Sequence, residues 1–217
     1  MFKVRPLCNL IQRNFCQWGV LHENLSVDES LIKYFGCHPA KKFLRGEPVR
    51  FGYKNWVATS SHGYCNTFDI YCGKSANASS DSPKVKFYSP ICKEHIVYFD
   101  NFFTNYQLPH DLRLQETRAT GTIRDNRTKK LLSVKEMKKR PRAEYDYRFD
   151  TKNEIAVVRW KDNNVVTMGT NFDKIEPVGK VRRWCSTRRQ KVNVNIPGLF
   201  VNYNKGMGGV DQMDHIP

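Results

Sequence analysis

Three short apolar or glycine-rich segments, spread along the whole chain, each carry one acidic residue. They are LSVDESLIKYFG at residues 25–36, VYFDNFFTN at 97–105 and GMGGVDQMD at 206–214, with the acids Asp28, Asp100 and Asp211. A carboxylate among apolar residues is costly because its charge loses water, so three such acids indicate convergence on a positive charge. Oxygen ligands without His or Cys favour Mg²⁺ or Mn²⁺ over zinc. The alternative is that each acid is a solvated residue at a strand end or helix start.

The residues around two of these acids predict strands. Residues 25–32 alternate between two sets with a period of two, which places Asp28 and Glu29 on opposite faces of a strand, so only one can face a metal. The continuous run His95–Phe99 predicts a central strand that is buried on both faces and ends at Asp100.

The third acid stands at the start of a short expected helix. Asp211 and Asp214 are spaced i, i+3, so both side chains can face one side of a first helical turn. Gly206, Gly208 and Gly209 allow the backbone to turn tightly before that helix.

Other stretches predict a mixture of helices and strands. The first 22 residues contain no acid, which is typical of a mitochondrial transit peptide, but their apolar residues also fall at the spacing of an amphipathic helix. Residues 37–52 are expected to form a loop. The remaining expected elements are strands at 53–60 and 64–71 around the turn 61–63, a helix at 106–116 weakened by Pro109, a strand at 118–124, and a hairpin of strands 154–160 and 165–170 around the turn 161–164.

The charge of the chain points to a polyanionic partner. Lys and Arg number 36 against 21 Asp and Glu, which gives a net charge of +15, and residues 111–205 carry about +12 of it. Nucleic acid is the first candidate and an anionic membrane surface the second, and no apolar run approaches the ~20 residues of a spanning helix. The candidates for phosphate contact are Lys129, Lys130, Lys138, Lys139, Arg140, Arg142, Arg182, Arg183, Arg188 and Arg189.

Three aromatic residues lie within or beside these basic stretches. Trp160, Trp184 and Tyr203 can stack on unpaired bases, but core packing is the favoured interpretation for each.

The cysteines exclude two classes of small domain. There are seven cysteines, an odd number, and none forms a C-x-x-C pair. This argues against both a disulfide scaffold and a zinc module, and favours reduced thiols inside a cell.

The wording of the acid-bearing segments resembles a known family. SVDES, YFDNFFTN and KGMGGVDQMD are similar, in this order, to the three catalytic-acid blocks of the piggyBac transposases. LHENLSVDES, LRLQETRATGTIRDNRTKK and the Trp- and Arg-rich stretch near Trp184 are similar to piggyBac-derived transposases, so the resemblance covers nearly the whole chain. It implies an α/β fold: a ribonuclease H-like mixed sheet with flanking helices, interrupted by a basic insertion domain that contains a β-hairpin.

The resemblance also implies a division of the chain. Residues 1–24 would be a helical lead-in, 25–125 the first part of the core, 126–204 the insertion domain, and 205–217 the start of the helix that carries the third acid. The chain would then be a fragment, truncated at both ends.

The activity implied by the resemblance is metal-dependent DNA cleavage and strand transfer. In such folds the first and fourth strands are neighbours, which would bring Asp28 and Asp100 within reach of one cation. Asp28 would bridge two Mg²⁺ or Mn²⁺ ions, Asp100 would hold one, Asp211 would hold the other, and Asp214 would support them. The implied setting is a nuclear protein that binds DNA, forms a possible homodimer, has no zinc site in this fragment and has no membrane partner.

Two departures from the family support an alternative function. Residues 84–94 are too short for the helix that family members usually have there, and the helix of the third acid stops at Pro217. The alternative is a catalytically inactive DNA-binding remnant of a decayed transposable element. A third possibility, a basic mitochondrial or membrane-surface protein, rests only on residues 1–22 and the net charge.

Overall fold

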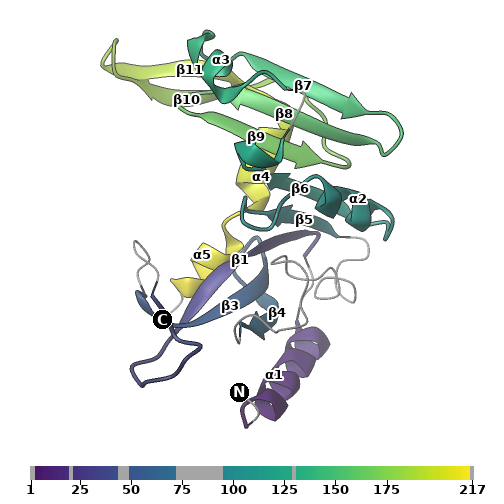
Figure 1. Ribbon diagram of the computed structural model, residues 1–217, viewed down its shortest axis with the longest axis vertical. Coiled ribbons are helices and arrows are strands. Elements are labelled where there is room, and N and C mark those ends of the chain that lie inside the picture. The colour runs from purple at the N-terminus through teal and green to yellow at the C-terminus, as the bar shows by residue number, and fades with distance from the viewer. Residues whose placement is uncertain (1–2, 20–21, 44–48, 72–94, 129–130, 216–217) are drawn as a thin grey trace. The chain divides into compact units, whose positions relative to one another are not determined.

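The computed structural model describes residues 3–19, 22–43, 49–71, 95–128 and 131–215 (Figure 1). The chain divides into two compact units, and each is described by itself. The first unit is Met1–His95 with Gly206–Pro217, and the second is Ile96–Lys205. The domain boundaries expected from the family resemblance divide the chain by its relation to the family, whereas these two units are divided by their internal contacts. The expected boundaries therefore remain a prediction. No helix in the described ranges is long and apolar enough to cross a membrane.

A small antiparallel sheet forms the centre of the first unit. Strand β3 (Phe51–Ser60) pairs with β1 (Asn24–Lys33) on one side, and with β4 (Cys65–Ile70) and β2 (Lys42–Phe43) on the other. The three long strands confirm the sequence-based prediction. The expected loop at 37–52 is interrupted by β2 and by the start of β3, because Gly52 has no Cβ to collide with the carbonyl of Ile32 and can pair there.

Helix α1 (Arg5–Trp18) packs along the outer edge of β4 and confirms the amphipathic helix. The Phe15 ring meets the rings of Tyr64 and Phe68 edge-on, at centroid distances of 6.1 and 6.4 Å. The Gln12 amide donates to the carbonyl of Phe68, and the Cys16 thiol lies 3.8 Å from the carbonyl of Asn66. Side chains of a helix therefore occupy backbone acceptors along a strand edge.

The second unit is built on a five-stranded mixed sheet. Its strand order is β5 (Ile96–Phe99), β6 (Arg118–Thr122), β9 (Val165–Thr170), β8 (Ile155–Lys161) and β7 (Tyr145–Asp150). The β5–β6 pair is parallel and the other pairs are antiparallel. Both the buried run before Asp100 and the β8–β9 hairpin were predicted from the sequence.

Helix α2 (Gln107–Arg113) connects the parallel strands and is shorter than the expected helix at 106–116. Pro109 falls within its first turn, where the missing N–H has no helical partner to lose. The chain turns out of the helix before Glu116, whose φ of 57° is incompatible with a continuing right-handed helix.

A second layer covers one face of this sheet. It consists of the two-stranded sheet β10 (Gly179–Cys185) and β11 (Gln190–Ile196), and of helix α4 (Gly198–Gly206). The Trp160 ring lies 5.1 Å from the Phe200 ring, and its indole N–H donates to the carbonyl of Asn195 at 3.1 Å. Trp160 and Tyr203 are 3% and 9% exposed, so both are core residues as favoured from the sequence. Trp184 is 56% exposed, so the favoured core interpretation is wrong for this residue.

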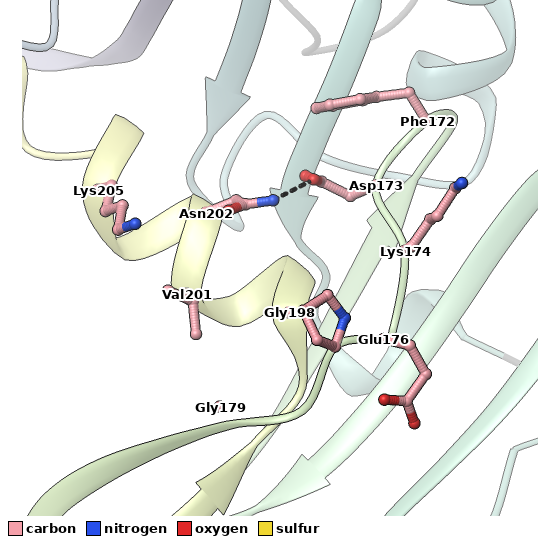
Figure 2. Close-up of a pocket in the computed structure, with 10 residues that line it drawn as sticks. Phe172, Asp173, Lys174, Glu176, Gly179, Gly198, Val201, Asn202 and Lys205 are labelled. Atoms are coloured by element: carbon pink, nitrogen blue, oxygen red, sulfur yellow. Dashed lines mark hydrogen bonds between the residues drawn. The ribbon is translucent and has the colours of Figure 1, made fainter.

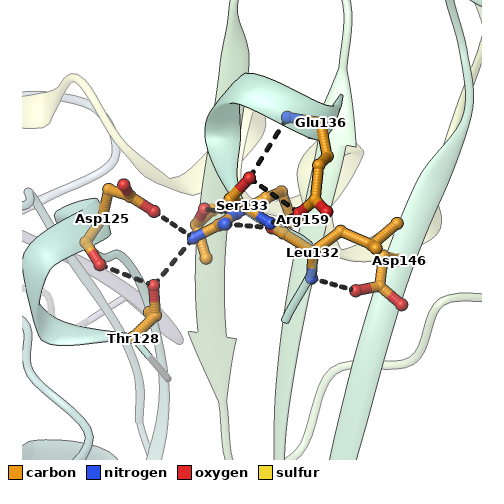
Figure 3. A network of polar contacts seen from close by, with 8 residues as sticks. Asp125, Thr128, Leu132, Ser133, Glu136, Asp146 and Arg159 are labelled. Carbon is orange, nitrogen blue, oxygen red and sulfur yellow. Dashed lines mark hydrogen bonds and ion pairs between the residues drawn. The ribbon is translucent and has the colours of Figure 1, made fainter. Parts of the chain in front are cut away.

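The opposite face of the sheet carries a buried arginine (Figure 3). Arg159 is 1% exposed and donates to Asp125 at 2.6 Å, to Thr128 at 2.7 Å, to Thr167 at 2.8 Å and to the carbonyl of Leu132. These bonds fix the 3₁₀ turn Asp125–Arg127 and the residues before helix α3 (Val134–Lys139) against β8. One buried charged side chain thus joins the loop to the sheet through hydrogen bonds, where a hydrophobic contact would be usual.

Candidate functional site

The polar face of β1 carries the first predicted ligand. Ser26, Asp28 and Ser30 share this face, because side chains of a strand alternate with a period of two. The amide of Gly208 donates to the Ser26 hydroxyl at 3.3 Å, and the Ser30 hydroxyl donates to a carboxylate oxygen of Asp214 at 2.7 Å. Helix α5 (Gly209–Asp214) therefore lies along the strand face that bears Asp28.

Two glycines allow α5 to lie this close to the sheet. Gly208 has a φ of 107°, a backbone conformation that other residues rarely adopt. A Cβ on Gly209 would collide with the carbonyl oxygen of Ser60 and with the Thr59 hydroxyl. The tight turn predicted before Asp211 is therefore present. Its glycines also leave out the side chain that would separate the helix from the strand.

The electrostatics of α5 centre on Asp214. Partial burial raises the pKa of its carboxyl and the neighbouring Asp211 raises it further, whereas the hydrogen bond from Ser30 and the nearby His215 lower it. A carboxyl that is partly desolvated and faces a like charge favours a compensating cation. Glu29, on the other face of β1, pairs with Lys54 at 2.5 Å, which gives it a structural role.

Asp100 lies in the second unit, directly after the end of β5. Its Oδ1 accepts a hydrogen bond from the Thr122 hydroxyl at 3.2 Å, at the end of the neighbouring parallel strand β6. Its carbonyl accepts from the amides of Phe103 and Thr104 at 3.1 and 3.2 Å, so the same residue closes the turn that follows. Carboxyl ends of parallel strands are common positions for binding sites in α/β proteins.

Two arginines beside Asp100 were not identified from the sequence. Arg127 donates to three carbonyls of the turn at residues 101–104, and Arg124 donates to the side chain of Asn101 at 2.9 Å. Both arginines belong to the sequence TIRDNR at residues 122–127. Nothing in a single sequence shows which cations of a basic region lie near the acids. They place positive charge next to the turn that holds Asp100.

The donor set fits a hard divalent cation. Asp28, Asp211 and Asp214 belong to the first unit and Asp100 to the second, and all four offer only oxygen atoms, which suit Mg²⁺ or Mn²⁺. Within the ranges that the structure describes, no three His, Cys, Asp or Glu side chains are grouped closely enough to hold a metal ion. Because the predicted set takes residues from both units, the metal site remains a prediction.

The predicted phosphate contacts fall into two groups. Lys138, Lys139, Arg140, Arg182, Arg188 and Arg189 are exposed, whereas Lys129 and Lys130 lie outside the described residues. Arg142 and Arg183 are only partly exposed and both bind Asp162, at 2.5 and 3.1 Å. Asp162 thus gives these two arginines a structural function, and their contact with DNA remains a prediction.

A cavity of about 450 Å³ lies in the second unit, between α4 and the loop after β9 (Figure 2). Asp173 stands at its wall and accepts hydrogen bonds from Thr120 at 2.6 Å and from Asn202 at 2.7 Å. Burial raises the pKa of the Asp173 carboxyl, and these two bonds and Arg118 oppose the rise. The carboxylate connects the loop to β6 and α4, which is a structural function.

Comparison with known proteins gives one consistent result. The family model described as Transposase IS4 matches residues 1–216. The human PiggyBac transposable element-derived proteins 2 and 3 are 37% and 35% identical to the chain over 98% of its length. The chain spans 38% of the length of each of these two relatives.

A solved structure shares the fold. It is the cryo-EM structure of a piggyBac transposase synaptic complex with hairpin DNA, and it matches 97% of this chain and 43% of its own chain, with a TM-score of 0.73 and 22% identity. The ribonuclease H-like mixed sheet with flanking helices predicted from the sequence is therefore confirmed. From the matching family model, the human relatives and this fold together, we conclude that the chain belongs to the piggyBac family of transposases and transposase-derived proteins.

Proposed function

We propose that this protein cleaves and joins DNA strands with divalent metal ions held by Asp28, Asp100, Asp211 and Asp214. One observation carries the proposal more than any other. Two hydrogen bonds, Gly208 to Ser26 and Ser30 to Asp214, hold α5 along the face of β1 that bears Asp28. An acid from the start of the chain and two from its end are thereby attached to neighbouring elements of one unit.

Each of these residues has a separate role in the proposed reaction. Bound Mg²⁺ or Mn²⁺ ions would supply an activated oxygen nucleophile and neutralise charge on the reacting phosphate. Asp28, Asp100 and Asp211 supply the carboxylates, and Asp214 supports them through its bond to Ser30. Thr122 orients the carboxylate of Asp100, and Arg127 fixes the turn that follows it.

DNA is the partner that the charge supports. The net charge of +15 is concentrated in the second unit, and the solved relative of similar fold is a complex with hairpin DNA. Homodimer formation and a nuclear location complete the proposal, and both come from the family resemblance.

Nicking of supercoiled plasmid DNA tests the proposal. We expect Mg²⁺-dependent nicking by the chain of residues 1–217, and a loss of at least about 100-fold in Asp100→Ala, because each metal ligand contributes to stabilising charge at the phosphate. Asp69→Ala is the matched control, since Asp69 is an exposed acid on β4 and should leave nicking unchanged.

The opposite result identifies the alternative function. DNA binding without any Mg²⁺-dependent nicking, and equal or stronger binding by Asp100→Ala, would contradict the catalytic proposal. It would identify the protein as a DNA-binding remnant.

A further inference from the structure

The two-stranded sheet β10–β11 has one face that points entirely to solvent. In the antiparallel register Lys180 lies opposite Asn195, Arg182 opposite Asn193, and Trp184 opposite Lys191. Directly opposed residues share a face, and all six of these side chains are exposed. We call this face, formed by Lys180, Arg182, Trp184, Lys191, Asn193 and Asn195, the β10–β11 platform.

The platform is positively charged and carries an exposed indole. No Asp or Glu occurs between residues 177 and 205, whereas Lys180, Arg182 and Lys191 stand on the platform itself. Arg188 and Arg189 extend the positive charge into the exposed turn between the strands. Trp184 is 56% exposed, although Trp160 and Trp56 in the same chain are nearly buried.

The inner face of the same strands fixes the platform to the rest of its unit. Val194 and Ile196 are 4% and 2% exposed, so they belong to the core. Arg183 points inward and pairs with Asp162, and Arg142 joins this pair and donates to the carbonyl of Trp184 at 3.2 Å. Asp162 therefore compensates the inward cations, while in the described part of the chain no ion pair involves Lys180, Arg182 or Lys191.

We propose that the β10–β11 platform binds an unpaired stretch of DNA. Lys180, Arg182 and Lys191 would neutralise phosphates, and Trp184 would stack on a base. A large exposed indole beside cations suits a single strand better than a duplex, because the faces of paired bases are covered by their neighbours in the stack. The choice of DNA as the nucleic acid rests on the function proposed above, whereas the preference for an unpaired strand rests on the platform.

Binding in EDTA tests this proposal without requiring cleavage. Fluorescence anisotropy would compare the full chain with labelled DNA of mixed sequence, as a single strand and as its duplex. Trp184→Ala should weaken single-strand binding about 5- to 100-fold, because the indole no longer stacks on a base, and leave duplex binding unchanged. Trp184→Phe should restore most of the affinity, and Trp18→Ala, which removes another exposed indole, should have no effect.

The cations have a separate readout in the salt dependence. The triple variant Lys180→Gln, Arg182→Gln and Lys191→Gln should lower the slope of log K against log salt by about 0.7 for each phosphate of the single strand that the protein no longer neutralises. Lys152→Gln removes an exposed charge in the β7–β8 turn and should leave the slope unchanged.

Two results would overturn the platform proposal: unchanged single-strand binding in Trp184→Ala, or an equal loss of affinity for single strand and duplex. Neither depends on metal. A protein that binds single strands through Trp184 but never nicks plasmid would contradict only the catalytic proposal. Nicking that persists while Trp184→Ala binds normally would contradict only this one.

Discussion

At the scale of single residues, Arg159 is the charged side chain on which its surroundings depend most. It is 1% exposed and donates hydrogen bonds to the carbonyl of Leu132 and to the hydroxyl of Thr167. We expect Arg159→Met to lower the free energy of unfolding by roughly 2–4 kcal/mol, because methionine fills the space but leaves these acceptors without a donor. Urea denaturation measures the change.

A neighbouring arginine provides the control for this variant. Arg148 on β7 has a side chain that is 57% exposed, so Arg148→Met should change the free energy of unfolding by no more than about 0.5 kcal/mol. Equal effects of the two variants would show that the network of Figure 3 contributes little to stability.

Asp214 should make stability depend on pH. Because the folded protein raises the pKa of this carboxyl, the folded state holds the proton more tightly than the unfolded state. Its ionisation therefore lowers stability as pH rises from the ordinary Asp pKa, about 3.9, through the raised value. Without metal, Asp214→Asn should melt at a higher temperature than the wild type at neutral pH, and the gap should close in acid.

Added Mg²⁺ should reverse this order. If Asp214 supports a metal ion, Mg²⁺ raises the melting temperature of the wild type more than that of Asp214→Asn. A difference between the two proteins that stays constant from acid to neutral pH would argue against the electrostatic cause.

At the scale of elements, the position of α5 depends on Gly209. A Cβ there would collide with the backbone of Ser60, so Gly209→Ala should displace the helix and abolish both nicking and Mg²⁺-induced thermal stabilisation. Gly208→Ala meets no neighbour within 4 Å and should cost only the backbone strain, about 1–2 kcal/mol. Melting curves with and without Mg²⁺ compare the two, and equal behaviour would contradict this role of Gly209.

Individual strands could be predicted from the sequence, but the contacts between distant elements could not. The period-two patterns of β1 and β3 and the hairpin β8–β9 are local signals, and the structure confirms them. Nothing in the sequence marks Ser26 and Ser30 as contacts of α5, yet they hold this helix from more than 180 positions away along the chain. A pattern that is local in sequence carries no information about such a partner.

At the scale of the whole molecule, the sequence predicted the family, the fold and a polyanionic partner. Net charge is a sum, so it cannot show which cations are used inside the protein. Asp162 binds Arg142 and Arg183, whereas Arg182 on the opposite face of the same strand is exposed. These two arginines are consecutive in the chain, and they differ only because successive side chains of β10 point to opposite faces of the sheet.

The contact between α1 and β4 has a consequence for the behaviour of the protein at high concentration. Strand β4 pairs with β3 on one side, and Gln12 and Cys16 occupy carbonyls on its other side. An uncovered strand edge recruits strands of other molecules and begins aggregation. We therefore expect helix α1 to prevent self-association by covering this edge. A version of the protein that lacks the helix should precipitate during purification even if its sheet still folds.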